Sequence, residues 1–194
     1  MIHPDTELRY KDAAVGHAVY ATRFIPRGTI VWTLCELDIR LPPARVAVLA
    51  LAYRAIIDRY AYGDADGDRI LCWDHGRYVN HACDPAMVGA GPEVEIAVRD
   101  LRPGDELTCD YGTLNLVQAL QCRCGAANCR SMIGADDALR VWPQLDALAR
   151  AAVGAAGLVP QPLDPFVREP RRLAEWIAGR APLPSSRAYH HESA

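Results

Sequence analysis

Hydrophobic positions near the start of the chain fall in short runs of β-branched and aromatic residues that turn signals interrupt, as in short strands. Residues 14–34 combine β-branched and aromatic side chains around the turn Pro26-Arg27-Gly28, which predicts short strands. The same strand–turn–strand pattern returns from Ala97, and two copies are too few for a solenoid. We therefore predict two similar units that bracket the middle of the chain. Similar residues recur in them at equal offsets: Ala21, Arg23, Ile25, Gly28 and Val31, then Ala97, Arg99, Leu101, Gly104 and Leu107.

Other segments have the spacing of amphipathic helices. Residues 136–153 predict a helix that is broken or bent near Pro143, and residues 169–181 predict a short helix after a Pro-rich linker. Residues 60–73 predict a hairpin, and residues 182–194 have the composition of a disordered tail. Residues 42–60 predict one helix, with Pro43 near its start and one apolar face formed by Val46, Leu49, Tyr53, Ile56 and Ile57.

The length and charge of the chain limit its class. A chain of 194 residues suffices for one domain with a core and an extension. It has no apolar run approaching 18 residues, and its N-terminus is acidic without an apolar segment, so we expect a cytoplasmic protein, with a secreted effector still open. The net charge of −3 disfavours direct nucleic-acid binding and suits either a basic peptide partner or a plain solvated surface.

The cysteines indicate a metal site rather than disulfides. Three of the seven lie within eight residues, at Cys122, Cys124 and Cys129, and a structural zinc ion needs four ligands. No further Cys or His follows nearby, so the best fourth ligand is Cys83, in the stretch GRYVNHACDPAMV. The alternative is three unligated thiols in a turn, which would be exposed to oxidation. We predict one structural zinc ion held by Cys83, Cys122, Cys124 and Cys129.

Four motifs in order resemble the SET domain of protein-lysine methyltransferases: GHAVYATRFIPRGTIV, RYVNHACDP, ELTCDYG and CRCGAANC. The last resembles the post-SET zinc motif, and the whole is most similar to short bacterial SET proteins. The resemblance implies a mostly β fold with α additions, a SET-domain fold of small curved β-sheets around a pseudoknot. It places the SET domain at residues 7–116, the post-SET motif at 117–131 and a C-terminal helical extension with a flexible tail at 132–194.

The resemblance also implies the site residues. Tyr111 matches the catalytic tyrosine, and Tyr62 and Cys109 match positions that line the substrate channel. The small Cys109 thiol leads us to expect room for di- or trimethyl-lysine. Ala18 stands where the family has a second Gly, and Ala86 where it has an Asn. The implied contacts to S-adenosylmethionine are Gly16, His17, Ala18, Tyr60, Asn80, His81 and Tyr111.

The implied function is methyl transfer from S-adenosylmethionine to a lysine of a protein or peptide substrate. The alternative is a catalytically silent SET-like module that binds peptides or partners through a zinc-stapled cleft. A zinc-ribbon nucleic-acid binder is disfavoured, because a second C-x-x-C is missing and the charge is acidic. The substrate, the oligomeric state and the role of the C-terminal extension, which either packs on the core or forms a dimer contact, stay open at this point.

Overall fold

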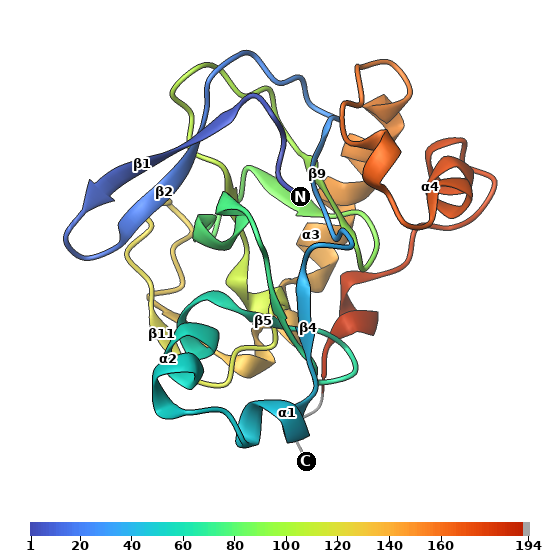
Figure 1. The fold of residues 1–194 in the computed structure, drawn as a ribbon. Helices are drawn as coiled ribbons and strands as arrows, with labels where there is room; N and C mark the ends of the chain where they lie inside the picture. The colour runs from blue at the N-terminus through green and yellow to red at the C-terminus, as the bar shows by residue number, and fades with distance from the viewer. Residues whose placement is uncertain (192–194) are drawn as a thin grey trace.

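The structure is a computed structural model that describes residues 1–191. Figure 1 shows the hairpin of the first two strands projecting on one side, while the helices of the C-terminal third gather on the opposite side. Among the described residues, no helix is both long and apolar enough to cross a bilayer.

The strands are short and form small sheets, as predicted for a mostly β fold with α additions. Within residues 1–191 the pairing is antiparallel except for one parallel pair, β7 with β10. The sheets, with strands in spatial order, are β1 (Thr6–Asp12) and β2 (Gly16–Ala21); β3 (Ile30–Thr33), β9 (Val94–Ala97) and β8 (Met87–Gly89); β4 (Ile39–Leu41), β6 (Arg69–Leu71) and β5 (Tyr62–Gly63); β7 (Asn80–His81) and β10 (Thr108–Cys109); and β11 (Leu120–Gln121) and β12 (Met132–Ile133).

The helices confirm two of the three predicted segments. The predicted helices at 136–153 and 169–181 correspond to α3 and α4, and the hairpin predicted at 60–73 is β5 with β6. The helix α3 continues through Pro143, so the break predicted there as one of two alternatives is absent. The helices are α1 (Pro43–Ala47), α2 (Leu51–Tyr60), α3 (Ala138–Ala156) and α4 (Pro170–Ile177), with short 3₁₀ turns η1 (His75–Tyr78), η2 (Tyr111–Thr113), η3 (Ala135–Asp137), η4 (Asp164–Phe166) and η5 (Ser186–Tyr189).

The single helix predicted at residues 42–60 is wrong, because the segment is divided into α1 and α2. Ala50 has extended backbone angles and starts the second helix. The expected apolar face is not a core face either: Tyr53 is 63% exposed and Ile56 is 44% exposed, whereas Ile57 is buried. Most of the stability of a helix in a protein comes from packing its apolar face against a core. Most of the apolar face of this segment is not packed in that way, so helical spacing alone did not predict one continuous helix correctly.

The tail predicted to be disordered is placed as far as His191, so that part of the prediction is wrong. Ser186 donates through its backbone N–H and its hydroxyl to Asp146 Oδ1, both at 2.8 Å. Asn115 Nδ2 donates to the Tyr189 carbonyl at 2.9 Å. These partners lie far away in sequence, and local composition carries no sign of them. The end of the predicted tail, residues 192–194, lies outside the described residues.

The two similar strand–turn–strand units lie against each other in a roughly reciprocal way. Each unit's turn glycine donates its backbone N–H to the alanine that opens the other unit. The pairing joins the start of the chain to its middle and explains why the same residues recur at matching offsets. The exchanged bonds are Gly28 to Ala97 (2.9 Å), Gly104 to Ala21 (2.8 Å), Ile25 to Leu101 (2.9 Å) and Leu101 to Ile25 (2.8 Å).

The sheet of β3, β9 and β8 separates two hydrophobic clusters. Ala97 and Met87 belong to the cluster that also contains Val19 of β2, whereas Val94 and Ile96 belong to the cluster that contains residues of α3. Gln161 fixes this arrangement, since its amide accepts from the Ile30 N–H and donates to the Gly28 carbonyl, both at 2.8 Å. The C-terminal extension therefore packs on the core, one of the two roles left open by the sequence.

Replacing Gly28 with alanine is expected to destabilise the fold more than the same change at Gly104. Both glycines have a φ of +92°, so the backbone penalty of about 1–2 kcal/mol is shared. An added Cβ at Gly28 would lie 2.9 Å from the Ala155 backbone in α3, whereas nothing lies within 4 Å at Gly104. Overpacking should cost Gly28→Ala a further ~1–3 kcal/mol. Urea unfolding of both variants measures the difference, and equal losses would contradict the close approach of α3.

Candidate active site and metal centre

Tyr111 lies where β10 ends, beside the Asn80-His81 strand. The parallel pairing of β10 with β7 places Thr108 opposite Asn80 and Cys109 opposite His81. The two motifs, about 30 residues apart, therefore meet side by side, as the resemblance implied. The Tyr111 hydroxyl donates to the Val79 carbonyl at 2.7 Å, and the Tyr111 backbone N–H donates to His81 Nδ1 at 3.1 Å.

The Tyr111 hydroxyl stays protonated across the ordinary pH range. Burial is the main cause that raises the pKa of Tyr111 well above its usual value, and nearby Cys109 and Glu106 add to it. The Tyr111 hydroxyl uses its hydrogen to donate to the Val79 carbonyl. Towards a bound group, the Tyr111 oxygen can therefore act as a hydrogen-bond acceptor.

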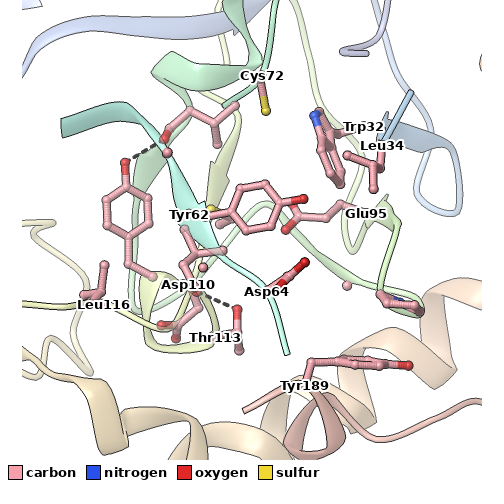
Figure 2. A pocket seen from close by; sticks show the side chains of 18 of the residues that line it. Trp32, Leu34, Tyr62, Asp64, Cys72, Glu95, Asp110, Thr113, Leu116 and Tyr189 are labelled. Atoms are coloured by element: carbon pink, nitrogen blue, oxygen red, sulfur yellow. Dashed lines mark hydrogen bonds between the residues drawn. The ribbon is translucent and has the colours of Figure 1, made fainter. Parts of the chain in front are cut away.

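A cavity of about 750 Å³ opens beside Tyr111. Figure 2 shows Tyr62 in its centre, with Trp32 and Glu95 nearby. Both residues predicted to line a substrate channel, Tyr62 and Cys109, lie in this wall. Burial raises the pKa of each of them, so both are neutral. The wall combines apolar and aromatic groups with several charged side chains. The members used below are Trp32, Tyr62, Val79, Gly89, Glu95, Cys109 and Tyr111.

Glu95 is a cavity residue that the sequence analysis missed. It lies in β9 between Val94 and Ile96, which face the α3 side, so its own side chain faces the cavity. Its Oε2 atom is fully covered and has no hydrogen-bond partner among the described residues. Burial raises the pKa of Glu95 to about 7. The available signal was one acidic residue within the otherwise apolar strand VEIA.

The residues predicted to contact a cofactor gather around Asn80. Its amide donates to the His17 carbonyl at 3.1 Å and to Glu106 Oε1 at 3.0 Å. Tyr78, which the sequence analysis did not assign, links two predicted residues, because its ring centroid lies 5.8 Å from that of His17 and 5.2 Å from that of Tyr60.

The backbone at the predicted glycine turn tolerates the alanine of this chain. Gly16 has a φ of +87°, whereas Ala18 lies within β2, is fully buried and is not in the left-handed region. The departure from the family pattern at Ala18 therefore strains nothing. Gly16 also lies near the end of α2, since a Cβ built on it would be 3.8 Å from Arg59 Nη2.

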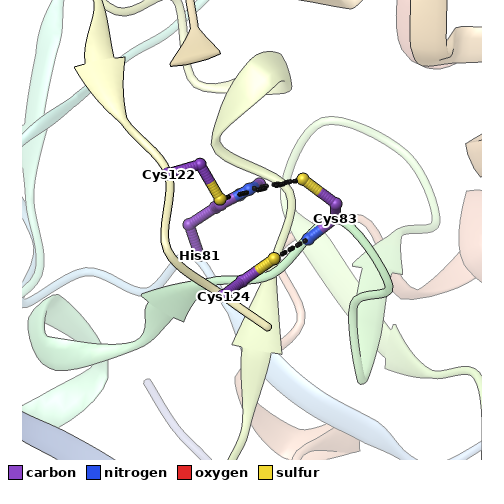
Figure 3. A group of neighbouring side chains, drawn as sticks. All are labelled: His81, Cys83, Cys122 and Cys124. Carbon is purple, nitrogen blue, oxygen red and sulfur yellow. Dashed lines mark hydrogen bonds between the residues drawn. The ribbon is translucent and has the colours of Figure 1, made fainter. Parts of the chain in front are cut away.

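The His81 imidazole lies in a cluster with the thiols of three cysteines. Figure 3 shows His81, Cys83, Cys122 and Cys124, whose potential ligand atoms all lie within 4.8 Å of one another. Cys129, the other predicted ligand, is not in that group, but its Sγ lies 3.6 Å from Cys122 Sγ. His81 is a residue that the sequence analysis assigned to the cofactor alone, although the spacing His-x-Cys was a usable signal.

Two sulfur–sulfur distances in the cluster match those expected around a tetrahedral zinc ion. Zinc bound to sulfur at about 2.3 Å separates neighbouring sulfur atoms by about 3.8 Å. The distance from Cys83 Sγ to Cys122 Sγ is 3.8 Å, and that from Cys129 Sγ to Cys122 Sγ is 3.6 Å. Backbone N–H groups also point at the sulfurs: Arg130 N–H lies 3.3 Å from Cys83 Sγ, and Cys83 N–H lies 3.5 Å from Cys124 Sγ. Such donors favour thiolates, the form that binds a metal.

Arg130 connects this cluster to the segment that carries Tyr111. Its backbone contacts Cys83, and its guanidinium donates two hydrogen bonds to Asp110, at 2.6 and 2.7 Å. Asp110 is 3% exposed and also accepts from the Gly112 N–H. A paired, buried carboxylate of this kind fixes the backbone on either side of Tyr111, so the order of the thiol cluster and the position of Tyr111 depend on each other.

Parts of the chain are similar in sequence to known proteins. The chain is 34% identical over 106 residues to the histone-lysine N-methyltransferase Set2 of Drosophila melanogaster, covering 50% of this chain and 4% of the relative. It is 39% identical over 70 residues to the histone-lysine N-methyltransferase ASHH2 of Arabidopsis thaliana, covering 31% of this chain and 4% of the relative. The chain thus spans only a small part of the length of these curated relatives.

A crystal structure of KRYPTONITE in complex with mCHG DNA and SAH superposes with a TM-score of 0.48 and 26% identity, over 66% of this chain and 29% of that one. The model of the SET domain matches residues 16–112, which is half of the chain. The chain therefore belongs to the SET domain family.

Proposed function

We propose that the protein is an S-adenosylmethionine-dependent methyltransferase that modifies a lysine side chain of a protein or peptide. The observation that carries the proposal is Tyr111, which stands in the cavity wall with its hydroxyl hydrogen directed at the Val79 carbonyl. The names of the relatives support the same chemistry, since they are histone-lysine N-methyltransferases. Membership of the SET domain family supports the choice of cofactor.

The residues at the cavity position an amine for attack. S-adenosylmethionine, when bound, supplies a methyl group on a positively charged sulfur. A free lysine has a pKa near ~10.4, and burial beside the Tyr62 and Cys109 side chains lowers it by desolvating the ammonium form. The Tyr111 oxygen then accepts one N–H of the neutral amine, which fixes the direction of the nitrogen lone pair. Positioning of this kind is worth up to about 7–11 kcal/mol of a reaction barrier.

We assign the structural zinc ion to Cys83, Cys122, Cys124 and Cys129 rather than to a set that includes His81. His81 Nδ1 accepts a hydrogen bond from the Tyr111 N–H, so the proton of the neutral ring is on Nε2. Nε2 lies 3.2 Å from Cys83 Sγ and donates to it. A protonated nitrogen cannot bind a metal, and His81 therefore supports a thiolate from outside the ligand set.

Binding and transfer together test the methyltransferase proposal. Calorimetry with S-adenosylmethionine should show one site per chain. Tritium from the labelled methyl group should appear in core histones or in proteins of a bacterial lysate, and hydrolysis of the labelled protein should yield methyl-lysine. Label on another amino acid would contradict the lysine assignment. Cofactor binding without transfer to any protein would instead favour the silent, partner-binding module.

The chain offers a control for self-modification, because Lys11 is its only lysine. Lys11 pairs with Glu106 at 2.6 Å, and arginine retains that ion pair. Lys11→Arg should leave transfer to other proteins unchanged and remove any label from the side chains of the protein itself.

A further inference from the structure

Glu95 occupies the central strand of the sheet that forms one wall of the cavity. Its neighbours across the strands are Trp32 on β3 and Gly89 on β8. Trp32 contributes an aromatic ring beside Glu95, whereas Gly89 contributes no side chain. Directly paired residues of antiparallel strands face the same side, which places all three on the cavity wall.

The charge of Glu95 has no partner within residues 1–191, unlike those of nearby carboxylates. Asp64 pairs with Arg40 at 2.6 Å, and Glu93 pairs with Arg168 at 2.9 Å. For Glu95, Oε2 is covered and forms no hydrogen bond. A buried acceptor without a partner is costly, and such groups are retained where a ligand completes them.

We propose that Glu95 recognises the side-chain amine of the substrate by accepting a hydrogen bond from its N–H, and so favours unmodified and monomethyl lysine over more highly methylated forms. This inference rests on the proposed function and adds a specificity residue to it. The ligand class is an alkylamine that retains at least one N–H.

Two attractions compete inside the cavity. The rings of Trp32 and Tyr62, packed edge to face with centroids 5.9 Å apart, attract any ammonium ion, including a trimethylated one. The Glu95 carboxylate adds a hydrogen bond only when the ion has an N–H, and hydrogen bonds to a charged group are the stronger kind. The Glu95 carboxylate should therefore make the cavity bind ammonium ions with an N–H more tightly than a trimethylated ion.

The same requirement limits the product. A neutral lysine amine has two N–H groups when unmodified, one when monomethylated and none once it carries two methyl groups. The Tyr111 oxygen and the Glu95 carboxylate can therefore both accept from the unmodified amine, whereas they share the single N–H of the monomethyl form. Methylation should then stop at dimethyl-lysine, which narrows the di- or trimethyl expectation drawn from the small Cys109 side chain.

Small amines test the recognition without knowledge of the protein substrate. The probes are n-butylammonium, its mono- and dimethyl derivatives and butyltrimethylammonium. Binding is measured by NMR titration of the full chain at a pH above the Glu95 pKa of about 7. The test variant is Glu95→Gln, which keeps the shape. The matched control is Glu93→Gln, two residues earlier in the chain, where an arginine compensates the charge.

The wild-type protein should bind n-butylammonium about tenfold or more tightly than butyltrimethylammonium. Glu95→Gln should abolish this preference, and Glu93→Gln should retain it. An equal or reversed preference in the wild type, a preference that survives Glu95→Gln, or no binding of any amine to the wild type would overturn the inference. Because amine binding is measured without methyl transfer, a failure of the methyltransferase proposal remains a separate result.

Discussion

Replacing Tyr111 with phenylalanine is expected to slow methyl transfer by about 100-fold or more. The change removes the oxygen that accepts the amine N–H and leaves the ring, which packs with its centroid 5.5 Å from that of His81. The Val79 carbonyl also loses its 2.7 Å hydrogen bond, which should cost the fold about 1–3 kcal/mol. Affinity for S-adenosylmethionine should stay nearly unchanged. Initial rates of tritium transfer and calorimetry measure the two quantities.

Tyr189→Phe is the matched control for this experiment. Tyr189 also lines the cavity and comes from the C-terminal extension, and its hydroxyl forms no hydrogen bond within the described part of the chain. Its loss should leave the transfer rate close to that of the wild type. If Tyr111→Phe transfers methyl groups at the wild-type rate, Tyr111 does not position the amine. If the two variants lose activity equally, the loss reports on the cavity as a whole and not on Tyr111.

The parts of the fold that follow from turn chemistry could be predicted from the sequence. Gly28 and Gly104 both need a left-handed backbone, and their repeated context indicated the two units that pair in the structure. The boundary between α1 and α2 could not be predicted, since helical spacing says nothing about whether a core covers the apolar face. The ordered structure of the tail could not be predicted for a related reason. Ser186 and Tyr189 form hydrogen bonds with residues that are distant in the sequence.

In the candidate site, too, some features could be predicted from the sequence and others depend on contacts between distant segments. Counting ligands was enough to connect Cys83 to the distant cysteines, because three thiolates require a fourth donor. The functions suggested for Glu95 and His81 depend on facts that the sequence does not contain. Glu95 matters because strand pairing points it into a cavity without a counter-charge, and His81 because the Tyr111 N–H selects its tautomer. Sequence motifs predict the reacting groups, whereas the residues that contact those groups can be identified only from the pairing of the strands.

Removing zinc is expected to have the largest effect on the structure. Cys122 is the best position to disrupt, because its sulfur lies within 4 Å of both Cys83 and Cys129. Structural zinc contributes about 10–16 kcal/mol of apparent binding free energy, which is comparable to the whole stability of a domain. Cys122→Ser, or treatment with a strong chelator, should release the ion. It should also free the segment after Tyr111 and stop methyl transfer, because Arg130 would no longer hold Asp110.

The readouts are zinc per chain by mass spectrometry, the melting temperature and limited proteolysis of the segment between Leu114 and Ile133. Cys35→Ser is the control, since Cys35 is buried but lies outside the cluster, and it should keep the metal. Two further variants decide the fourth ligand. Cys129→Ser should lose zinc, whereas His81→Gln should keep it and lose activity through Tyr111. The opposite result would make His81 the ligand, and a Cys122→Ser protein with full zinc and an unchanged melting temperature would contradict the metal site altogether.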